Sequence, residues 1–374
     1  MQERRYDLDW LRVIAIVLLH LFHCAMPFAA ESGWHLKNDE LSNLVLECNF
    51  FLSRWRMPLL FFISGVGTVF VLNQLSIQQY AWQRTKRLLF PLLFGMLVVV
   101  PPQVYFERIY KKIAYTSYFD FYPSIFTTGA YPIGNFSWHH LWFVAYLFLF
   151  SLVSIPIFIY LRSLQGAILT DKVALFSAKV GLYWFALLLY LGSALLIWYP
   201  EETHAIFDDW ATFTKYLLYF LFGFFIGVNP IFWSEIETNR QTYLKVAFFS
   251  TLAINYFRWN NVEPDWGLHA ANLFYWALLI LSAWTWILSI LGYAKAYLNF
   301  NNRFLAIANE GIYPFYILHQ TFIVMIAYYV LQVHETIASK YFFLTLTSFV
   351  LSIGCYMFLV KPYKITRFLF GMKT

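Results

Sequence analysis

Charged residues are scarce in this chain of 374 residues, where Asp, Glu, Lys and Arg fill only 12% of the positions. A soluble domain usually has about 25% charged residues, so the composition excludes an ordinary soluble protein. Hydrophobic residues make up 60% of the chain, and no polar region is longer than a loop. We therefore expect a multi-pass membrane protein with one integral-membrane domain over residues 1–374.

Cysteine is scarce as well. Cys24, Cys48 and Cys355 all lie in apolar surroundings and show no CxxC spacing, so they predict neither a disulfide framework nor a zinc site. The formal charge of +6 does not indicate a nucleic-acid partner, because the basic residues are scattered among apolar segments. Basic residues in that arrangement are topology signals.

Apolar segments long enough to cross a bilayer occur at about ten places. Cytoplasmic loops carry an excess of Lys and Arg, and most of the 26 basic residues fall on one side if the N-terminus is cytoplasmic. The sequence thus predicts an all-α protein of about ten transmembrane helices around a polar cavity, with both termini inside. The expected segments lie near residues 10–30, 41–74, 88–106, 140–161, 178–199, 211–229, 242–257, 268–292, 312–331 and 341–361.

The first segment, residues 6–28, carries Asp9, Arg12, His20 and His23 within an apolar run. At about 100° and 1.5 Å per residue, Arg12 and His23 lie within roughly 20° of one helix face and about 16 Å apart in depth. Ionisable residues inside a bilayer are costly and normally face a bundle interior or a wet cavity. This pattern makes His23, in the outer half of the membrane, the leading candidate for a functional residue.

Blander interpretations of this segment stay open. A cleaved signal peptide has a similar beginning, but Arg12 and the histidines interrupt the apolar core and many apolar segments follow. Arg12 could instead extend its guanidinium to the inner interface. We interpret His20, which lies off the Arg12 face, as a packed interior residue.

The second segment contains Glu47, followed by Arg54 and Arg56 and then by Pro58. Proline removes a helical hydrogen bond, so we expect this helix to be broken beside a cavity. Glu47 could orient the imidazole of His23, or it could pair with Arg54 or Arg56 as a structural bridge. Both interpretations are open.

Two further groups lie near the predicted inner surface or within the ninth segment. Arg84, Lys86 and Arg87 lie at the cytoplasmic entrance of the third segment and could hold a phosphate, although such a cluster is more often a membrane anchor. Tyr313 and His319 belong to the ninth segment, where His319 is either a ligand or a packed histidine.

The stretch from Ser137 to Val144 places His139, His140 and Trp142 at the outer end of the fourth segment. Adjacent residues face different directions on a helix, and no HxxxH spacing or carboxylate partner at helical spacing accompanies them. The sequence therefore predicts no metal site. The three side chains could line a pocket for an acceptor sugar or belong to an interfacial aromatic belt.

Taken together, these stretches resemble the membrane-bound acyltransferase family three, and especially its glucan succinyltransferase branch. The resemblance rests on four motifs in the same order and on Trp34-His35 in the first outer loop. One departure is Leu147, because many members have a glutamate five residues after the tryptophan that corresponds to Trp142. The matched motif residues are Asp9, Arg12 and His23; Phe61, Phe62, Ser64 and Gly65; Arg84, Arg87 and Pro91; and Tyr313, Tyr316 and His319.

The resemblance implies an enzyme of the bacterial inner membrane that moves an acetyl or succinyl group from cytoplasmic acyl-CoA to a hydroxyl of an extracytoplasmic glycan. His23 would be the general base, because a neutral imidazole is suited to that role, and Glu47 would orient it. Direct transfer is favoured over an acyl-enzyme, and a homodimer is left open. A transporter or flippase that uses the same ionisable residues is the alternative. The expected donor residues are Arg12, Arg84, Lys86, Arg87, Tyr313 and His319, and the expected acceptor residues are His35, His139, His140 and Trp142.

Overall fold

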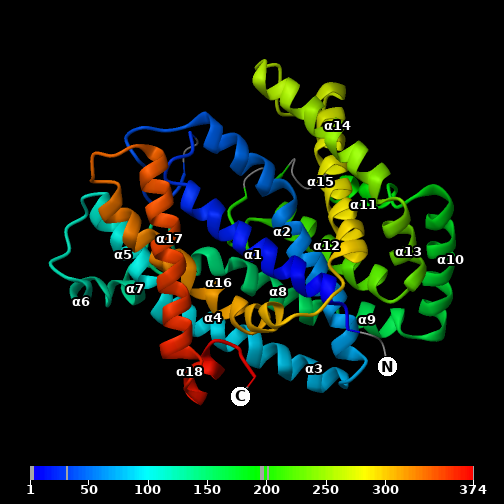
Figure 1. Ribbon diagram of the computed structural model, residues 1–374, viewed down its shortest axis with the longest axis horizontal. Coiled ribbons are helices and arrows are strands. Elements are labelled where there is room, and N and C mark those ends of the chain that lie inside the picture. The colour runs from blue at the N-terminus through cyan, green and yellow to red at the C-terminus, as the bar shows by residue number, and fades with distance from the viewer. Residues whose placement is uncertain (1–3, 31–32, 194–197, 200–201, 374) are drawn as a thin grey trace. The chain divides into compact units, whose positions relative to one another are not determined.

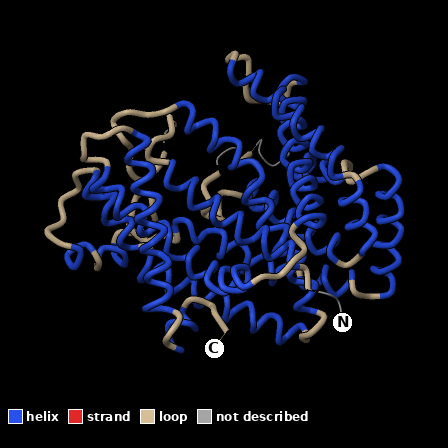
Figure 2. Tube along the Cα trace, in the orientation of Figure 1, coloured by secondary structure: helices blue, strands red, loops and turns tan. Residues whose placement is uncertain are grey.

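The computed structural model describes residues 4–30, 33–193, 198–199 and 202–373. Helices account for nearly all of its regular structure, and these described residues include two isolated β-bridges but no strand (Figure 2). The prediction of an all-α protein is therefore confirmed. Residues 194–197 of the predicted segment 178–199, and residues 200–201 of the loop after it, lie outside the described residues.

Seven helices within the described ranges are long and apolar enough to cross a membrane, and the number rises to nine if each of two bent pairs forms one span. The bent pairs are His139–Val153 with Ile155–Leu161, and Leu164–Val180 with Phe185–Gly192. The multi-pass prediction is confirmed at this level, whereas ten spans are not. The seven are α1 (Tyr6–Ala25), α2 (Asn43–Leu72), the stretch Ile77–Tyr110, α12 (Trp210–Gly227), α15 (Ala270–Tyr297), α16 (Arg303–Val330) and the stretch Ile337–Val360.

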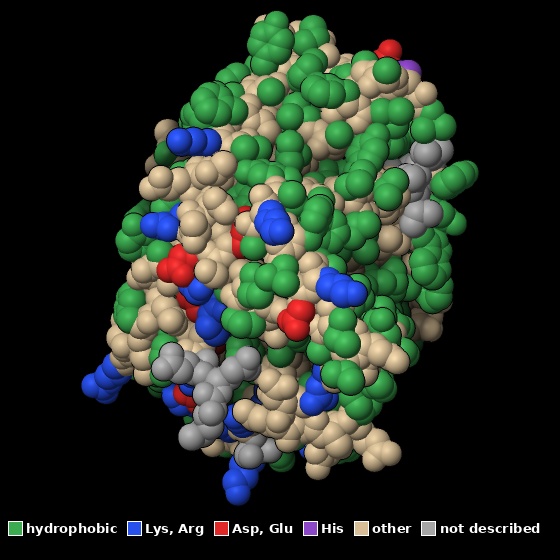
Figure 3. Space-filling model, turned by 90° about the vertical axis from the view of Figure 1, so that its right-hand side faces the viewer, with side chains coloured by type: hydrophobic (Ala, Val, Ile, Leu, Met, Phe, Trp, Pro, Cys, Tyr) green, Lys and Arg blue, Asp and Glu red, His purple; other side chains and the backbone are tan. Residues whose placement is uncertain are grey.

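Figure 3 shows many hydrophobic side chains exposed on one face of the molecule, with Lys and Arg side chains scattered among them. Large exposed side chains include Phe176 on α10 (Leu164–Val180) and Phe248 and Phe249 on α14 (Arg240–Trp259). Apolar side chains that find no partner inside a protein are readily covered by lipid. α14 covers the predicted segment 242–257 but is not among the candidate spans.

The chain divides into two compact units. The first comprises Met1–Arg12, Arg54–Tyr80 and Leu149–Asn302, and the second comprises Val13–Ser53, Ala81–Phe148 and Arg303–Thr374. The first unit includes α9 (Ile155–Leu161), α10, α11 (Phe185–Gly192), α12, α13 (Pro230–Thr238), α14 and α15.

Within the first unit, α2 and α12 approach so closely that glycine is required on both sides. A Cβ atom on Gly65 would overlap the carbonyl oxygen of Phe220, and one on Gly223 would overlap that of Phe62. Small residues commonly allow such close approach between membrane helices. The glycine of the FFxxSG motif therefore has a packing role.

The predicted break at Pro58 is wrong, because α2 is one continuous helix with Pro58 inside it. Proline costs one backbone hydrogen bond, but membrane helices tolerate it where neighbouring groups or small local adjustments satisfy the freed carbonyl.

In the second unit, α16 packs against both α5 (Pro101–Tyr110) and α17 (Ile337–Cys355), which can be followed in Figure 1 as the orange, cyan and red helices. Phe28, Ile323 and Leu344 are fully buried in its apolar core. Three π-helical segments also belong to this unit: η1 (Thr85–Leu89), η2 (Gly95–Val99) and η5 (Tyr356–Val360). Such segments occur frequently at functional sites.

Candidate functional site

His23 on α1 and His319 on α16 form a hydrogen-bonded pair in the second unit. The Nδ1 atom of His23 lies 2.9 Å from the Nε2 atom of His319, and the rings stack with centroids 5.2 Å apart and an interplanar angle of 12°. The Nδ1 atom of His319 lies 2.6 Å from the carbonyl oxygen of Tyr316. The two residues are 296 positions apart in the sequence, and the fold brings them together.

These contacts determine where the protons lie. A carbonyl oxygen can only accept, so the Nδ1 atom of His319 must carry a hydrogen. In neutral His319 the Nε2 atom is then an acceptor, and His23 donates to it through Nδ1–H. The lone pair of neutral His23 is consequently on Nε2.

Two more histidines surround this pair. The ring centroids of His20 and His140 lie 6.0 Å and 5.3 Å from that of His319. The Nε2 atom of His140 lies 3.0 Å from the carbonyl oxygen of Ile317, and that of His20 lies 3.1 Å from the carbonyl oxygen of Thr345. Both side chains are buried, and both Nε2 atoms bond a backbone acceptor, which fixes their tautomers in the neutral state.

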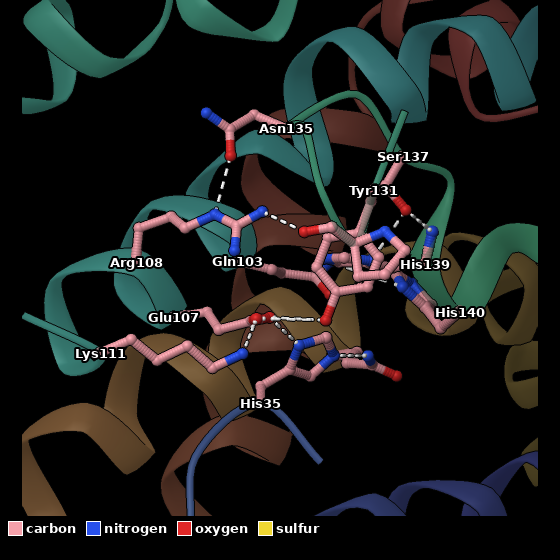
Figure 4. A network of polar contacts seen from close by, with 12 residues as sticks. His35, Gln103, Glu107, Arg108, Lys111, Tyr131, Asn135, Ser137, His139 and His140 are labelled. Carbon is pink, nitrogen blue, oxygen red and sulfur yellow. Dashed lines mark hydrogen bonds and ion pairs between the residues drawn. The ribbon is translucent and has the colours of Figure 1, made fainter. Parts of the chain in front are cut away.

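A second polar group surrounds Glu107 of α5, which sequence reasoning missed. The fully buried Glu107 carboxylate lies 2.5 Å from the Nδ1 atom of His35, and it accepts hydrogen bonds from Lys111 Nζ at 2.6 Å and from the Tyr131 hydroxyl at 3.1 Å (Figure 4). Burial and the adjacent carboxylate raise the pKa of the Tyr131 hydroxyl, which therefore stays protonated and donates. The spacing of Gln103 and Glu107 on one helix face was a signal that could have drawn attention to both residues.

His139 lies against the same group. Its ring centroid is 4.6 Å from that of His35 and 4.8 Å from that of Tyr131. Its backbone φ of +40° is left-handed, which is uncommon for histidine. The Arg108 guanidinium holds the loop before His139 in place. It donates to Asn135 Oδ1 at 2.8 Å and to the carbonyl oxygens of Pro132 and Gly134.

One turn of α16 contacts both polar groups. Gln320, next to His319, places its amide nitrogen 3.2 Å from the Nε2 atom of His35. The Thr321 hydroxyl accepts from the Gln103 amide at 2.7 Å, and Gln103 also lies 3.4 Å from the Nδ1 atom of His140. The predicted acceptor residues His35, His139 and His140 thus lie on one polar path that leads to the pair of His23 and His319.

The predicted inner cluster also lies in the second unit. Arg84 ends α3 (Ile77–Arg84), while Lys86 and Arg87 belong to η1. A Cβ atom on Gly371, which has φ +67°, would meet both the carbonyl oxygen of Arg87 and the ring of Tyr313. The structure therefore brings Arg87 and Tyr313 together with the C-terminal segment.

The other predicted site residues occupy separate positions. Arg12 lies in the first unit, where its Nη1 atom is 3.4 Å from Asp9 Oδ1. Trp142 begins α8 (Trp142–Val153) and packs edge-on against Tyr146 with centroids 5.4 Å apart. Glu47 is half-buried on α2, and its role toward His23 stays a prediction.

Comparison with known proteins gives this chain a family context. The sequence model of a family described as "Acyltransferase domain" matches residues 5–357. Two curated relatives, each named "Glucans biosynthesis protein C" and found in Salmonella heidelberg and Salmonella typhimurium, are 27% identical to it over 188 residues. That match covers 49% of this chain and 47% of each relative, so the chain spans about half the length of the curated relatives it matches. No solved structure matches the chain.

Proposed function

Because this chain belongs to the acyltransferase family, we propose that it is a membrane O-acyltransferase. It moves an acetyl or succinyl group from cytoplasmic acyl-CoA to a hydroxyl of an extracytoplasmic glycan. The printed name of the curated relatives, which refers to glucan biosynthesis, supports a glycan acceptor. The match across residues 5–357 supports a single acyltransferase domain.

The hydrogen bond between His23 and His319 is the observation that carries this proposal. His23 Nε2 accepts the hydroxyl proton as the sugar oxygen attacks the thioester carbonyl, which forms the new C–O bond. The C–S bond then breaks, and the imidazolium of His23 returns its proton to the departing thiolate. His319 Nε2 accepts from Nδ1–H of His23 throughout, so it stabilises the positive charge that develops on the ring.

The donor side of the proposal uses the inner cluster. Arg84, Lys86 and Arg87 would neutralise the phosphates of acyl-CoA, and guanidinium groups suit that task because they bind phosphate oxygens in pairs. Tyr313 supports this placement because it adjoins Arg87. Arg12 belongs to the first unit, and its role toward the donor stays a prediction.

The acceptor side uses the polar path of His35, His139 and His140, with Trp142 to stack on a sugar ring. The distribution of Lys and Arg supports cytoplasmic termini, and the resemblance to the acyltransferase family supports the bacterial inner membrane. His319 is shifted in this scheme from donor binding to the support of His23, while Glu47 is retained as a second orienting residue.

Radiolabelled acyl-CoA tests the proposal. Purified protein in proteoliposomes is supplied with acyl-CoA labelled in the acyl group on one side and an oligomeric glucan on the other. We expect labelled ester on the glucan and an equal amount of free CoA thiol. Uptake of intact acyl-CoA without thioester cleavage would instead support the transporter.

A further inference from the structure

Three side chains of the kind that ligate metals converge from separate segments beside the proposed acyltransfer site. His35 comes from the loop between α1 and α2, Glu107 from α5, and His139 from the start of η3 (His139–Leu141) (Figure 4). Their ligand atoms all lie within 4.8 Å of one another. Two imidazoles and one carboxylate form a common ligand set for Zn²⁺ and other first-row divalent ions. We propose that His35, Glu107 and His139 bind one divalent transition-metal ion, with Zn²⁺ as the reference ion.

Of the three side chains, His139 points most clearly to a ligand. Its Nε2 atom is buried and has no hydrogen-bond partner in the part of the chain that the structure describes. Buried polar atoms in this state are rare and require an explanation. Ser137 Oγ lies 2.8 Å from the other ring nitrogen, Nδ1. When that hydroxyl accepts from Nδ1–H, the lone pair is on Nε2, as metal ligation requires.

His35 and Glu107 already share the position that an ion would take. Their 2.5 Å contact holds one proton between Nδ1 and Oε2. Two ligands with bonds of about 2.1 Å to a tetrahedral ion are roughly 3.4 Å apart. An ion that replaces this proton therefore requires His35 Nδ1 and Glu107 Oε2 to move apart by about 1 Å. The ring of His139 would also move toward the ion.

Gln320 supplies the supporting contact for His35. Its Oε1 atom is buried without a partner among the described residues, and its Nε2 atom faces the Nε2 atom of His35. The two ends of an amide are interchangeable by rotation. Rotation of the amide places Oε1 where it accepts from Nε2–H of His35, which leaves Nδ1 free to ligate.

The positive charge of Lys111 would repel the ion, so a variant without that charge tests the proposal. Its Nζ atom lies 2.6 Å from Oε1 of Glu107, whereas His35 contacts Oε2. The ion would use Oε2 alone while Lys111 keeps Oε1. Because its side chain is 48% exposed, Lys111 can also move toward solvent. Removing its positive charge should strengthen binding, which a purely structural hydrogen-bond network does not predict.

The experiment measures metal binding by the full-length protein in detergent, purified with a tag that lacks histidine and then stripped with a chelator. Equilibrium dialysis against Zn²⁺ gives stoichiometry and affinity, and Co²⁺ absorption reports the ligand set. We expect one equivalent in the wild type and its loss in His139→Ala and Glu107→Gln. Ser137→Ala should bind about 10- to 100-fold more weakly, and Lys111→Met should bind more tightly. The exposed His334 provides the control variant His334→Ala, which should bind normally.

Two results would overturn the proposal. One is the absence of Zn²⁺ binding in both the wild type and Lys111→Met. The other is binding that persists in His139→Ala but is lost in His319→Ala, which would assign the ion to the other histidine group. The gain in Lys111→Met cannot arise from misfolding, so it keeps the test decisive if other variants fold poorly.

Discussion

Replacing His319 by alanine removes the acceptor of the His23 Nδ1–H hydrogen bond, whose length is 2.9 Å. In the proposed reaction His23 becomes positively charged in the transition state, so this bond is stronger there than in the ground state. A hydrogen bond contributes about 1.5–3 kcal/mol when one partner is charged and about 0.5–1.5 kcal/mol when both are neutral, so the transition state loses roughly 1–1.5 kcal/mol more than the ground state. At about 1.4 kcal/mol for each tenfold change in rate, kcat should fall about 5- to 10-fold.

The assay is steady-state transfer of label from acyl-CoA to glucan by folded protein, with kcat and KM measured separately. We expect KM for acyl-CoA to change little, because His319 supports His23 and does not hold the donor. His319→Gln, which retains an amide oxygen as acceptor, should recover part of the rate. An unchanged kcat, or a defect confined to KM for acyl-CoA, would refute this reasoning and return His319 to the donor site.

Three other variants test separate parts of the account. Gly65→Ala should lower the free energy of unfolding by about 1–3 kcal/mol through overpacking, which is measured as a lower unfolding temperature in detergent. The control variant Gly67→Ala should be tolerated, because a Cβ atom at that position meets nothing within 4 Å. Equal effects of the two variants would contradict the packing role of Gly65. Arg87→Ala should raise KM for acyl-CoA several-fold in the transfer assay, while the exposed Arg162→Ala should not. Tyr131→Phe should cost about 1.5–3 kcal/mol of stability, because a buried carboxylate loses a donor; an unchanged unfolding temperature would contradict this.

Composition and local patterning were sufficient to predict the helical membrane class. Scarce charge and long apolar runs indicate segments that cross a bilayer, and a chain inside the bilayer must satisfy its backbone hydrogen bonds internally, as a helix does. They did not reveal that two of the longer helical segments are bent, by 52° and 106°. Bends of this size depend on tertiary packing. When each bent pair is one span, the described residues hold nine candidate spans, and the tenth predicted segment is 242–257 in α14, which is not among them.

Local spacing made His23 a candidate, but it could not predict the contact between His23 and His319. His319 is on another helix, and only the packing of α1 beside α16 in the second unit places the two rings together. The prediction that no metal binds near His139 considered only carboxylates at helical spacing and stays untested. Glu107 belongs to α5, and the fold brings its carboxylate within 4.8 Å of the ligand atom of His139. Pro58 shows the opposite case, because a strong local signal was overridden by the surroundings of α2.

The most direct test of the central claim replaces His23 by asparagine, whose side-chain amide can still donate toward His319 but cannot act as a general base at neutral pH. The measurement is the rate at which labelled acyl groups reach the glucan, compared with the wild type at equal amounts of folded protein. We predict a loss of at least about 100-fold, in line with the usual contribution of general base catalysis. Transfer at the wild-type rate would contradict the assignment of His23 as the base.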